Sequence, residues 1–437
     1  MKQLDVCVTL SLLLLLLQAP LQLAQTQPHS KSPADVMADS ESTNLAEFSR
    51  RLAKFSVNMY GKLVASKPNT NVVFSPFSIQ TCAAMARLGA DGETAAELDR
   101  GLQLVSSDVA KIAESFHQVL AAYEKSTILR IANKIYLMKG YELNDEFSAL
   151  VSNKFLSPGQ NVDFSKNVEA ANLINTWVEQ QTNNLIKDLV APSLLDAQTR
   201  LVLINAIHFK GNWVHKFPEH ATRDERFHLS ETESVNVPMM NLKERFRYAN
   251  LPNLDAAALE LPYKDSDLSM LILLPNSKTG LAQLEEKLST TPLSQITEQL
   301  QSTQVMVKLP KFKAEFQVEL TPAFKELGMT SMFSDKADFS KMLKAPEELK
   351  VSAIIHKAFI DVNEHGTEAA AATAAVIRQK RSLIGYQQPV EFHADHQFIY
   401  VLAHTQHVPI FYGSVVRLNG ATSDAPLAAP GSEHDEL

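Results

Sequence analysis

Cysteine is almost absent from this chain. Only Cys7 and Cys82 occur among 437 residues, and Cys7 lies in an N-terminal segment that we expect to be removed. One remaining thiol excludes an internal disulfide, so the stability of the folded protein must come from packing. Cys82 lies in the apolar run SIQTCAAMARLGA. We expect it to be a small buried hydrophobic residue, with an intermolecular disulfide as the lesser alternative.

The motifs of common enzyme classes are also missing. No G-x-S-x-G elbow, Walker loop, dinucleotide fingerprint or H-E-x-x-H helix occurs, which argues against an enzyme. The best metal candidates are two histidine pairs with i, i+3 spacing, His393 with His396 and His404 with His407. Because no cysteine or carboxylate set accompanies them, we interpret these histidines as structural. We expect no metal and no cofactor.

The chain has neither a long basic block nor an excess of positive charge. Its formal net charge is −8 at pH 7, with 45% hydrophobic and 21% charged residues. This balance argues against nucleic-acid binding and membrane-surface binding, and it favours a protein partner. The length allows a large core, and no internal linker divides it. We expect a monomer.

The N-terminal segment has the features of a secretory signal. Residues 1–24 combine Lys2 with an apolar run at 6–17, which is short for a transmembrane helix. Residues 25–43 are polar and rich in proline and serine, and we expect them to form a flexible leader.

The C-terminal segment, residues 419–437, is a low-complexity stretch that we expect to be a flexible tail. Its last four residues match the HDEL signal, by which a receptor returns lumenal proteins to the endoplasmic reticulum. These residues are His434, Asp435, Glu436 and Leu437. We therefore expect the protein in the lumen of the endoplasmic reticulum and the secretory pathway, with some of it secreted.

Hydrophobic spacing changes character along the chain. It predicts helices at 44–60, 75–88, 109–123, 145–154 and 166–189, with a short one inside ADGETAAELDRGL. It predicts strands at 128–138, 199–213, 257–275 and 303–320, and a hairpin in which 397–404 pairs with 410–418. Helices in the first half and strands in the second, without βαβ alternation, indicate an α+β fold with mostly antiparallel sheets.

One stretch, EHGTEAAAATAAVIRQKRSL at 364–383, fits neither a helix nor an ordinary strand. Alanine favours helix, yet only Thr373 is polar between Ala369 and Ile377, so a helix there would have no solvated face. The segment combines a run of very small residues with a cluster of positive charge.

Several segments, taken together and in order, resemble the serpin family. They are NVVFSPFSIQTCAAMARLGADGET, INTWVEQQTNNLIKDL, LINAIHFKGNWVHKF, VKLPKFKAEFQVEL, HKAFIDVNEHGTEAAAATA, EFHADHQFIYVL and PIFYGSVVRL. The resemblance as a whole covers about residues 44–418. The resemblance implies a serpin domain with three mostly antiparallel sheets, about nine helices and an exposed reactive loop at about 364–389. The chain departs from the family at Asn183 and Asn184, where Gly-Lys is frequent, and at Gln397, where proline is frequent.

The resemblance also implies a role for the alanine run. Serpin loop insertion is a general example of strand addition to a sheet: after cleavage, the first half of the loop becomes a new strand. Gly366 would give the hinge free dihedrals, and small side chains would let the strand enter quickly. The hinge residues are Glu364, Gly366, Thr367, Glu368, Ala369, Ala370, Ala371, Ala372 and Thr373. Thr367, Ala369, Ala371 and Thr373 alternate onto one face.

Five more residues match family positions that control opening of the large sheet. Lys311 matches the partner of Glu364 where insertion begins, with Trp213 packing nearby. Ser75, Asn205 and His356 match a polar cluster under the centre of the sheet. A role in fold stability alone is the alternative for all five.

A basic tetrad follows the alanine run and consists of Arg378, Gln379, Lys380 and Arg381. It has the R-x-K-R pattern that furin-like, subtilisin-type proprotein convertases cleave. Their acidic clefts bind several cationic side chains at once, whereas a trypsin-like protease needs only one. We therefore expect cleavage between Arg381 and Ser382. Arg381 lies one residue farther from Gly366 than is usual in the family, which leaves cleavage after Lys380 as an alternative.

The sequence thus predicts a protease inhibitor that traps furin-like convertases as a covalent acyl complex. Inhibition of trypsin-like proteases is one alternative. A non-inhibitory serpin that assists folding in the endoplasmic reticulum is another, although the small-residue hinge argues against it. A chain that convertases merely cut is a third.

Overall fold

Helices predominate in the first half of the chain and strands in the second, as the sequence predicts. The computed structural model describes residues 33–104, 106–345, 347–367, 388–404 and 408–419. The expected signal peptide, the basic tetrad and the HDEL residues lie outside these ranges. Contacts group Asn44–Leu437 into one compact unit, which contains every strand of the described ranges. No helix in the described ranges is both long enough and apolar enough to cross a membrane.

The described residues contain nine α-helices. They are α2 (Pro33–Ser66), α3 (Pro76–Gly89), α4 (Gly92–Gly101), α5 (Val109–Tyr123), α6 (Asp145–Lys154), α7 (Asn167–Gln181), α8 (Leu281–Leu288), α9 (Leu293–Thr297) and α10 (Thr321–Glu326). Short 3₁₀ turns occur at η1 (Pro192–Leu194), η2 (Glu219–Ala221) and η3 (Ser331–Phe333).

Local sequence explains where several helices begin. Asp108 and Asn144 accept hydrogen bonds from the first backbone N–H groups of α5 and α6, and both helices have the predicted bounds. Ser75 caps α3 in the same way, accepting from the backbone N–H of Ser78, and Pro76 occupies the first helical position.

Two predicted boundaries are corrected. α2 begins at Pro33, inside the stretch expected to be a flexible leader, because proline suits the first turn and no further proline or glycine follows before Asn44. The helix predicted to reach residue 189 ends at Gln181. Asn183 and Asn184 adopt φ angles of 53° and 63°, a left-handed conformation that ends helices and that asparagine tolerates better than most residues.

Sixteen strands lie within the described residues. They are β1 (Val72–Phe74), β2 (Leu129–Met138), β3 (Gln160–Val162), β4 (Leu201–Phe209), β5 (Gly211–Asn212), β6 (Arg223–His228), β7 (Ser234–Leu251), β8 (Ala256–Pro262), β9 (Leu268–Pro275), β10 (Gln301–Pro310), β11 (Phe312–Glu319), β12 (Val351–Asn363), β13 (Gly366–Thr367), β14 (Val390–His393), β15 (Phe398–His404) and β16 (Pro409–Val415). The predicted C-terminal hairpin is confirmed, because β15 pairs antiparallel with β16.

These strands form two hydrogen-bonded sheets. The seven-stranded sheet has the order β3-β2-β4-β12-β13-β5, with β11 also paired to β12. The nine-stranded sheet has the order β1-β16-β15-β9-β8-β7-β10-β14, with β6 paired to β7. Three sheets were expected, and two of them are joined into the nine-stranded sheet here, because one end of β7 pairs with β6 and the other with β8.

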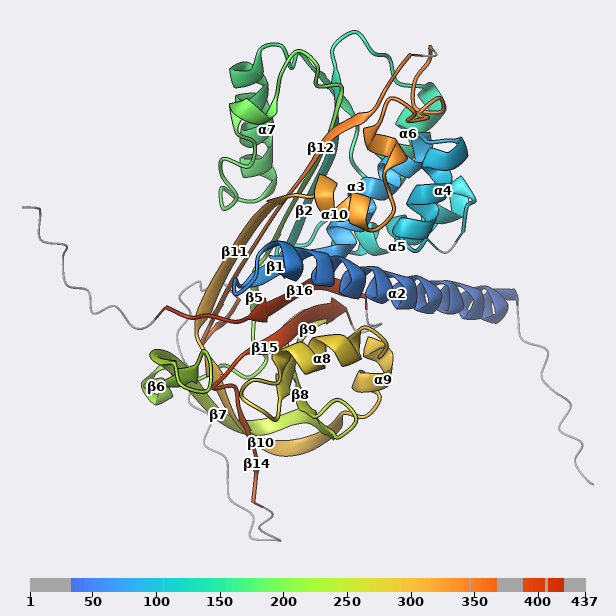
Figure 1. Cartoon of the computed structure of the whole chain (residues 1–437). Coiled ribbons are helices and arrows are strands. Elements are labelled where there is room, and N and C mark those ends of the chain that lie inside the picture. The colour runs from blue at the N-terminus through green and yellow to red at the C-terminus, as the bar shows by residue number, and fades with distance from the viewer. Residues whose placement is uncertain (1–32, 105, 346, 368–387, 405–407, 420–437) are drawn as a thin grey trace, which may run out of the picture. The chain divides into compact units, whose positions relative to one another are not determined.

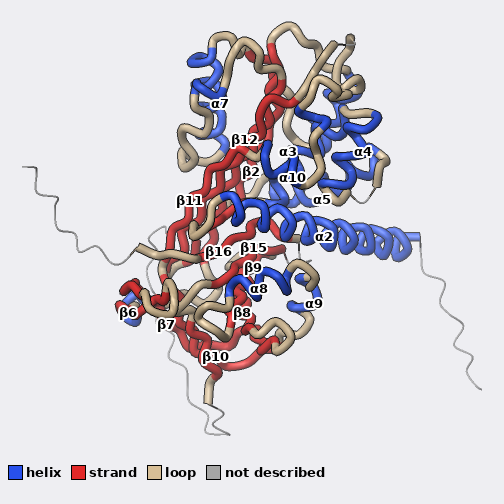
Figure 2. Tube along the Cα trace, viewed as in Figure 1, coloured by secondary structure: helices blue, strands red, loops and turns tan. Residues whose placement is uncertain are grey.

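The seven-stranded sheet is covered on both faces. Figure 1 shows α7 on one side of it and α3, α4, α5 and α6 on the other, and Figure 2 shows the same layers by element type. A smaller apolar cluster lies between the sheet and α7, where Tyr136 and Ile174 are fully buried. The larger cluster lies on the α3 face and extends to the nine-stranded sheet.

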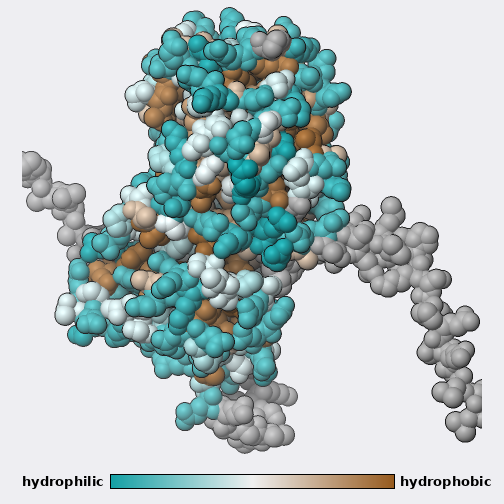
Figure 3. Space-filling model, turned by 45° about the vertical axis from the view of Figure 1, so that its right-hand side comes forward, coloured by the Kyte–Doolittle hydropathy of each residue, from teal (hydrophilic) through white to brown (hydrophobic). Residues whose placement is uncertain are grey.

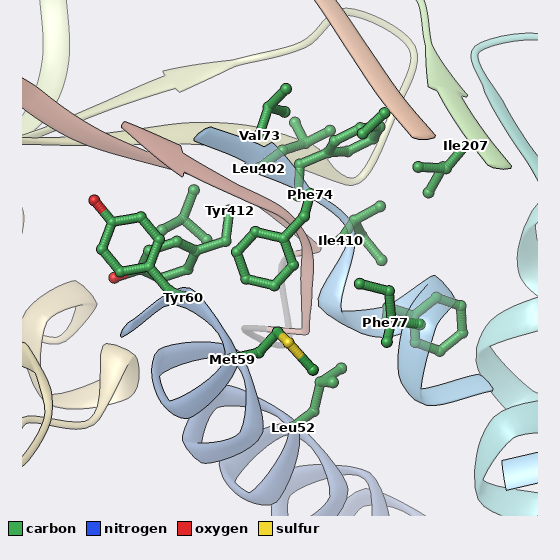
Figure 4. Packing of buried hydrophobic residues seen from close by; sticks show 14 of the residues in the cluster. Leu52, Met59, Tyr60, Val73, Phe74, Phe77, Ile207, Leu402, Ile410 and Tyr412 are labelled. Atoms are coloured by element: carbon green, nitrogen blue, oxygen red, sulfur yellow. The ribbon is translucent and has the colours of Figure 1, made fainter. Parts of the chain in front are cut away.

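In Figure 4, Met59 and Tyr60 of α2 pack beside Phe74 of β1 and Tyr412 of β16. On the face shown in Figure 3, hydrophilic residues predominate and hydrophobic ones are scattered among them, as is normal for a protein surface. Burial in these clusters is the main source of stability, because the described residues contain no disulfide.

Candidate functional site

The candidate site begins where β12 ends and the chain turns back as β13. Gly366 and Thr367 pair antiparallel with β12 on one side, opposite Asn363 and Val362. On the other side they pair antiparallel with β5, opposite Asn212 and Gly211. Gly366 and Thr367 of the hinge are therefore already a strand between two neighbours.

Gly366 cannot be replaced by a residue with a side chain without displacing the backbone. Its φ is +151°, and a Cβ at this position would lie 2.0 Å from the carbonyl oxygen of Gly211. Only glycine permits both this conformation and this close approach. The structure thus gives a steric reason for the glycine at the hinge.

Thr367 is fully buried, and its side chain has one polar partner. The Oγ1 of Thr367 and the hydroxyl of Tyr263 share a hydrogen bond of 2.7 Å. Burial raises the pKa of Tyr263, so the phenol stays neutral. The Tyr263 ring stacks on Trp213 with centroids 4.4 Å apart. An aromatic wall therefore fixes the side chain at the start of β13.

The carboxylate of Glu364 is held by two side chains at once. Its Oε2 lies 2.9 Å from the Lys311 amine, and its Oε1 accepts a hydrogen bond from Thr222. Burial alone would raise the pKa of Glu364, but these two bonds hold it below the usual value. Trp213 reinforces the turn, since its indole N–H donates to the carbonyl of Asn363 at 3.0 Å. We call Trp213, Lys311 and Glu364 the breach.

Below the breach, β4 and β12 are directly paired and run parallel. Their register places His356 opposite Asn205 and Phe359 opposite His208. The residues on either side of β13 continue this register: Thr367 lies between Val362 and Gly211, and Gly366 lies between Asn363 and Asn212. A strand that continued beyond Thr367 would therefore lie between β4 and β12, antiparallel to both.

A buried polar cluster lies under this boundary on the α3 face, formed by Ser75, Ser78, Asn133, Asn205 and His356. The backbone N–H of Ser75 donates to Nε2 of His356 at 3.3 Å, so the proton must be on Nδ1, which donates to Oδ1 of Asn205. Burial lowers the pKa of His356 to about 3. The ring is therefore neutral at any physiological pH.

The hydrogen-bond chain continues through amide groups. Nδ2 of Asn205 donates to Oδ1 of Asn133 and to Oγ of Ser78, both at 2.6 Å. The Ser75 hydroxyl donates to the carbonyl of Ile410 at 2.6 Å. The cluster thus joins α3, β2, β4, β12 and β16, and a bond from β12 to β4 lies at its centre.

The structure brings the five predicted control residues into these two groups, Trp213 and Lys311 at the breach and Ser75, Asn205 and His356 in the cluster. Five further residues of the site were not predicted from the sequence, namely Gly211, Thr222, Tyr263, Ser78 and Asn133. Asn133 alone carried a signal. It alternates with Ile131 and Ile135 on the core-facing side of β2, and an amide on an apolar face needs a buried partner.

The other predicted residues divide between described and undescribed positions. Glu368, Ala369 to Thr373, Arg378 to Ser382 and the HDEL residues lie outside the described ranges. Cys82 is fully buried, its Sγ lies 3.4 Å from the carbonyl of Ile204, and burial raises its pKa. Its predicted role as a small core residue is confirmed.

The histidine pairs have separate surroundings. His393 lies 3.3 Å from Glu225, and His396 contacts Asp395 and the carbonyl of Pro275. His404 packs edge-on against Tyr123, while His407 lies outside the described ranges. Among the described residues, no group of three or more histidine, cysteine or carboxylate side chains is placed to hold a metal ion.

Comparison with known proteins agrees with this geometry. The family model described as "Serpin (serine protease inhibitor)" matches residues 50–418. Alaserpin of Manduca sexta is 43% identical over 367 residues, which cover 83% of this chain and 92% of that protein. Antitrypsin of Bombyx mori is 37% identical over 349 residues, covering 80% and 88%.

A solved structure described as "Cleaved Serpin 42Da" is 65% identical and has a TM-score of 0.80. The match covers 86% of this chain and all of that one. The ordered motifs, the breach, the buried polar cluster and these matches lead to one conclusion. The chain belongs to the serpin family of serine protease inhibitors.

Proposed function

We propose that this serpin traps furin-like, subtilisin-type proprotein convertases as a covalent acyl complex after cleavage between Arg381 and Ser382. The observation that carries the proposal is the pairing of Gly366 and Thr367 between β12 and β5. This pairing supports the proposal because a strand continued in the same register would lead between β4 and β12. A hinge that served only as a tether would not need this pairing.

The register assigns a position to each residue that follows. Thr367 lies opposite Val362 and Gly211, and each further residue moves one position back along both strands. Thr373 would then come between His356 and Asn205, which now face each other. Insertion would replace one parallel pairing by two antiparallel ones, which are slightly more stable per residue.

The side chains of the hinge fit this path. Residues of the same parity as Thr367 would face α3, where Val362, Ile360 and Ala358 of β12 are already buried. Ala369 and Ala371 would enter this layer with the smallest side chain that still has a Cβ. A larger residue there would need space that a close-packed interior does not provide.

The chemical step takes place on the protease. The protease serine attacks the carbonyl carbon of Arg381, a tetrahedral intermediate forms, and the bond to the Ser382 nitrogen breaks, so the new amine leaves with a proton from the protease histidine. Water would normally hydrolyse the resulting ester. If the freed strand inserts first, it pulls the acylated serine away from its oxyanion hole and the ester persists. Inhibition is a competition between insertion and hydrolysis.

The basic tetrad supports a convertase as the target. Arg378 and Arg381 at its two ends exceed what a trypsin-like protease requires, and an acidic cleft that binds both gains charge and planar hydrogen bonding from each. The N-terminal signal and the HDEL residues support the same assignment, because they would keep the inhibitor where convertases mature.

The test is a denaturing gel of the purified chain mixed with a furin-like convertase. A covalent band at about the sum of the two masses is expected. Cleavage of the loop with full protease activity remaining would show a substrate, and no reaction would leave the folding-helper alternative.

Specificity is tested by Arg378→Ala. This change should slow convertase inhibition at least about tenfold, the effect of losing one charged hydrogen-bonding partner, and leave trypsin inhibition nearly unchanged. Gln379→Ala is the matched control and should affect neither. Equal losses against both proteases from Arg378→Ala would reject the convertase assignment.

A further inference from the structure

We propose that Asn363 is a positioning residue for loop insertion, because its side chain fixes the turn that sets the register of the entering strand. Asn363 is the last residue of β12, and the chain turns back through Glu364 and His365 to β13. The inference rests on the proposed inhibition by loop insertion, but not on which protease is trapped. It assigns a role to a residue that precedes the hinge.

The turn has a conformation that two-residue hairpin loops usually avoid. Asn363 pairs with Gly366, so Glu364 and His365 form a two-residue loop between β12 and β13. Such loops favour type I′ or II′ turns, which need a positive φ at the first central residue. Neither Glu364 nor His365 has a positive φ. Because turns of types I and II splay the strands that they join, this turn needs support beyond the pairing of its strands.

The side chain of Asn363 supplies part of this support. Its Oδ1 accepts a hydrogen bond of 3.0 Å from the backbone N–H of His365. A bond from a side chain to the backbone two residues further along is an Asx turn, which asparagine and aspartate form in tight turns. Because Asn363 is only 9% exposed, water competes poorly for this oxygen. The bond therefore favours the closed form of the turn.

The segment that follows β5 holds the carbonyl groups of the turn. The indole N–H of Trp213 donates to the carbonyl of Asn363 at 3.0 Å, and its backbone N–H donates to the carbonyl of His365 at 2.9 Å. The backbone N–H of Phe217 donates to the carbonyl of Glu364 at 3.0 Å. Both donor residues are buried. Each carbonyl from Asn363 to His365 therefore has a donor on this segment, provided that the turn is closed.

The turn decides which residues of the loop would enter the core. Turn geometry fixes the register of a hairpin, and a slip of one residue moves every side chain to the opposite face. Thr367 lies opposite Val362. In this register Ala369 and Ala371 would face α3, and Glu368 would face away. After a slip of one residue Glu368 would face α3, where an unpaired carboxylate is costly to bury. A turn that opens easily would therefore slow correct insertion and leave more time for hydrolysis.

The test compares Asn363→Ala with Asn363→Ser, whose hydroxyl can accept from the same N–H. A denaturing gel with a convertase, and separately with trypsin, gives the ratio of cleaved chain to covalent complex. This ratio equals the rate of hydrolysis divided by the rate of insertion. Asn363→Ala should raise the ratio about fivefold, the effect of losing one hydrogen bond. Asn363→Ser should keep it within about twofold of the unchanged chain.

Asn276→Ala is the matched control. It removes the hydrogen bond of 2.8 Å from Nδ2 of Asn276 to Asp255, next to β8 and β9, and should leave the ratio unchanged. Because only folded chains react, a loss of stability alone does not alter the ratio. An unchanged ratio in Asn363→Ala would overturn the proposal, and so would equal rises in Asn363→Ala and Asn363→Ser.

Hydrogen exchange on the uncleaved chain separates this inference from the proposed function. The amides of Gly366 and Thr367 report the pairing of β13 without any protease. Their exchange should be about fivefold faster in Asn363→Ala than in the unchanged chain, and unaltered in Asn276→Ala. Unaltered exchange in Asn363→Ala would overturn the role of Asn363 in the turn. The absence of a covalent complex from the unchanged chain with either protease would instead overturn the proposed function, and with it the role in insertion.

Discussion

Replacing Thr373 by valine tests whether the inserted loop reaches the buried polar cluster. The register of β13 predicts that Thr373 comes to lie between His356 and Asn205 after cleavage. The hydrogen bond from His356 to Asn205 is then lost, and the Thr373 hydroxyl is placed to pair with the groups that it leaves. In the uncleaved protein β4 and β12 are directly paired, so no residue occupies that position.

The expected effect is therefore confined to one state. Thr373→Val leaves a buried polar group without a partner only when the strand has inserted, which costs about 1–3 kcal/mol. Denaturant unfolding of the cleaved protein should show this loss, and unfolding of the uncleaved protein should not. Thr373→Ser, which keeps the hydroxyl, should restore the cleaved protein. Equal destabilisation of both states, or of neither, would refute the register.

Three further predictions concern the hinge and the cluster. Thr367→Arg puts a charge where the side chain is fully buried. Because burying an unpaired charge costs several kcal/mol, insertion should slow by at least about a hundredfold, and a gel with convertase should show cleaved chain in place of the covalent complex. Thr367→Ser should still form the covalent complex. His356 has a pKa of about 3 in the folded protein against 6.5 in the unfolded chain, so between these values only the unfolded chain takes up the proton. As the pH falls from 6.5 to about 3, the free energy of unfolding should therefore decrease by about 1.4 kcal/mol per pH unit. The same pH dependence in His356→Gln would show that it does not come from His356. Lys311→Met leaves the Glu364 carboxylate with Thr222 as its one partner and should lower the free energy of unfolding by about 1–2 kcal/mol. The control is Lys313→Met, which removes an ion pair of a 72% exposed lysine and should change the free energy of unfolding by less than about 0.5 kcal/mol. Equal effects of the two changes would contradict a special role of Lys311.

Local signals in the sequence predict those elements that local interactions determine. The bounds of α5 and α6 follow from a capping side chain and an apolar stripe, and the hairpin of β15 and β16 follows from two β-rich runs with a turn between them. The long strand β7 was not predicted. Its buried residues do not alternate regularly, because its two ends pair with different neighbours.

The candidate site divides in the same way. The breach and cluster residues could be predicted because ordered motifs in the sequence resemble those of a family, and not because their chemistry is visible in isolation. Tyr263 and Thr222 contact Thr367 and Glu364 across more than a hundred residues of chain. Such partners depend on the tertiary arrangement. The close approach of Gly211 to Gly366 likewise requires the pairing of β5 with β13.

The chemistry of the boundary between β4 and β12 suits a sheet that must open. Every residue of β4 is buried, and a continuous apolar contact with β12 would lose much of its burial energy on separation. Asn205 and His356 instead meet through one hydrogen bond between neutral groups, whose net contribution is about 1 kcal/mol as long as both groups find partners again. Ser75, Ser78 and Asn133 remain beside them after separation, and an incoming hydroxyl can replace the lost contact. A fully apolar boundary would be harder to open, and a charged pair would cost more to leave unpaired. Under the proposed mechanism, a neutral polar cluster would keep the uncleaved sheet closed and leave the barrier to insertion low enough to compete with hydrolysis.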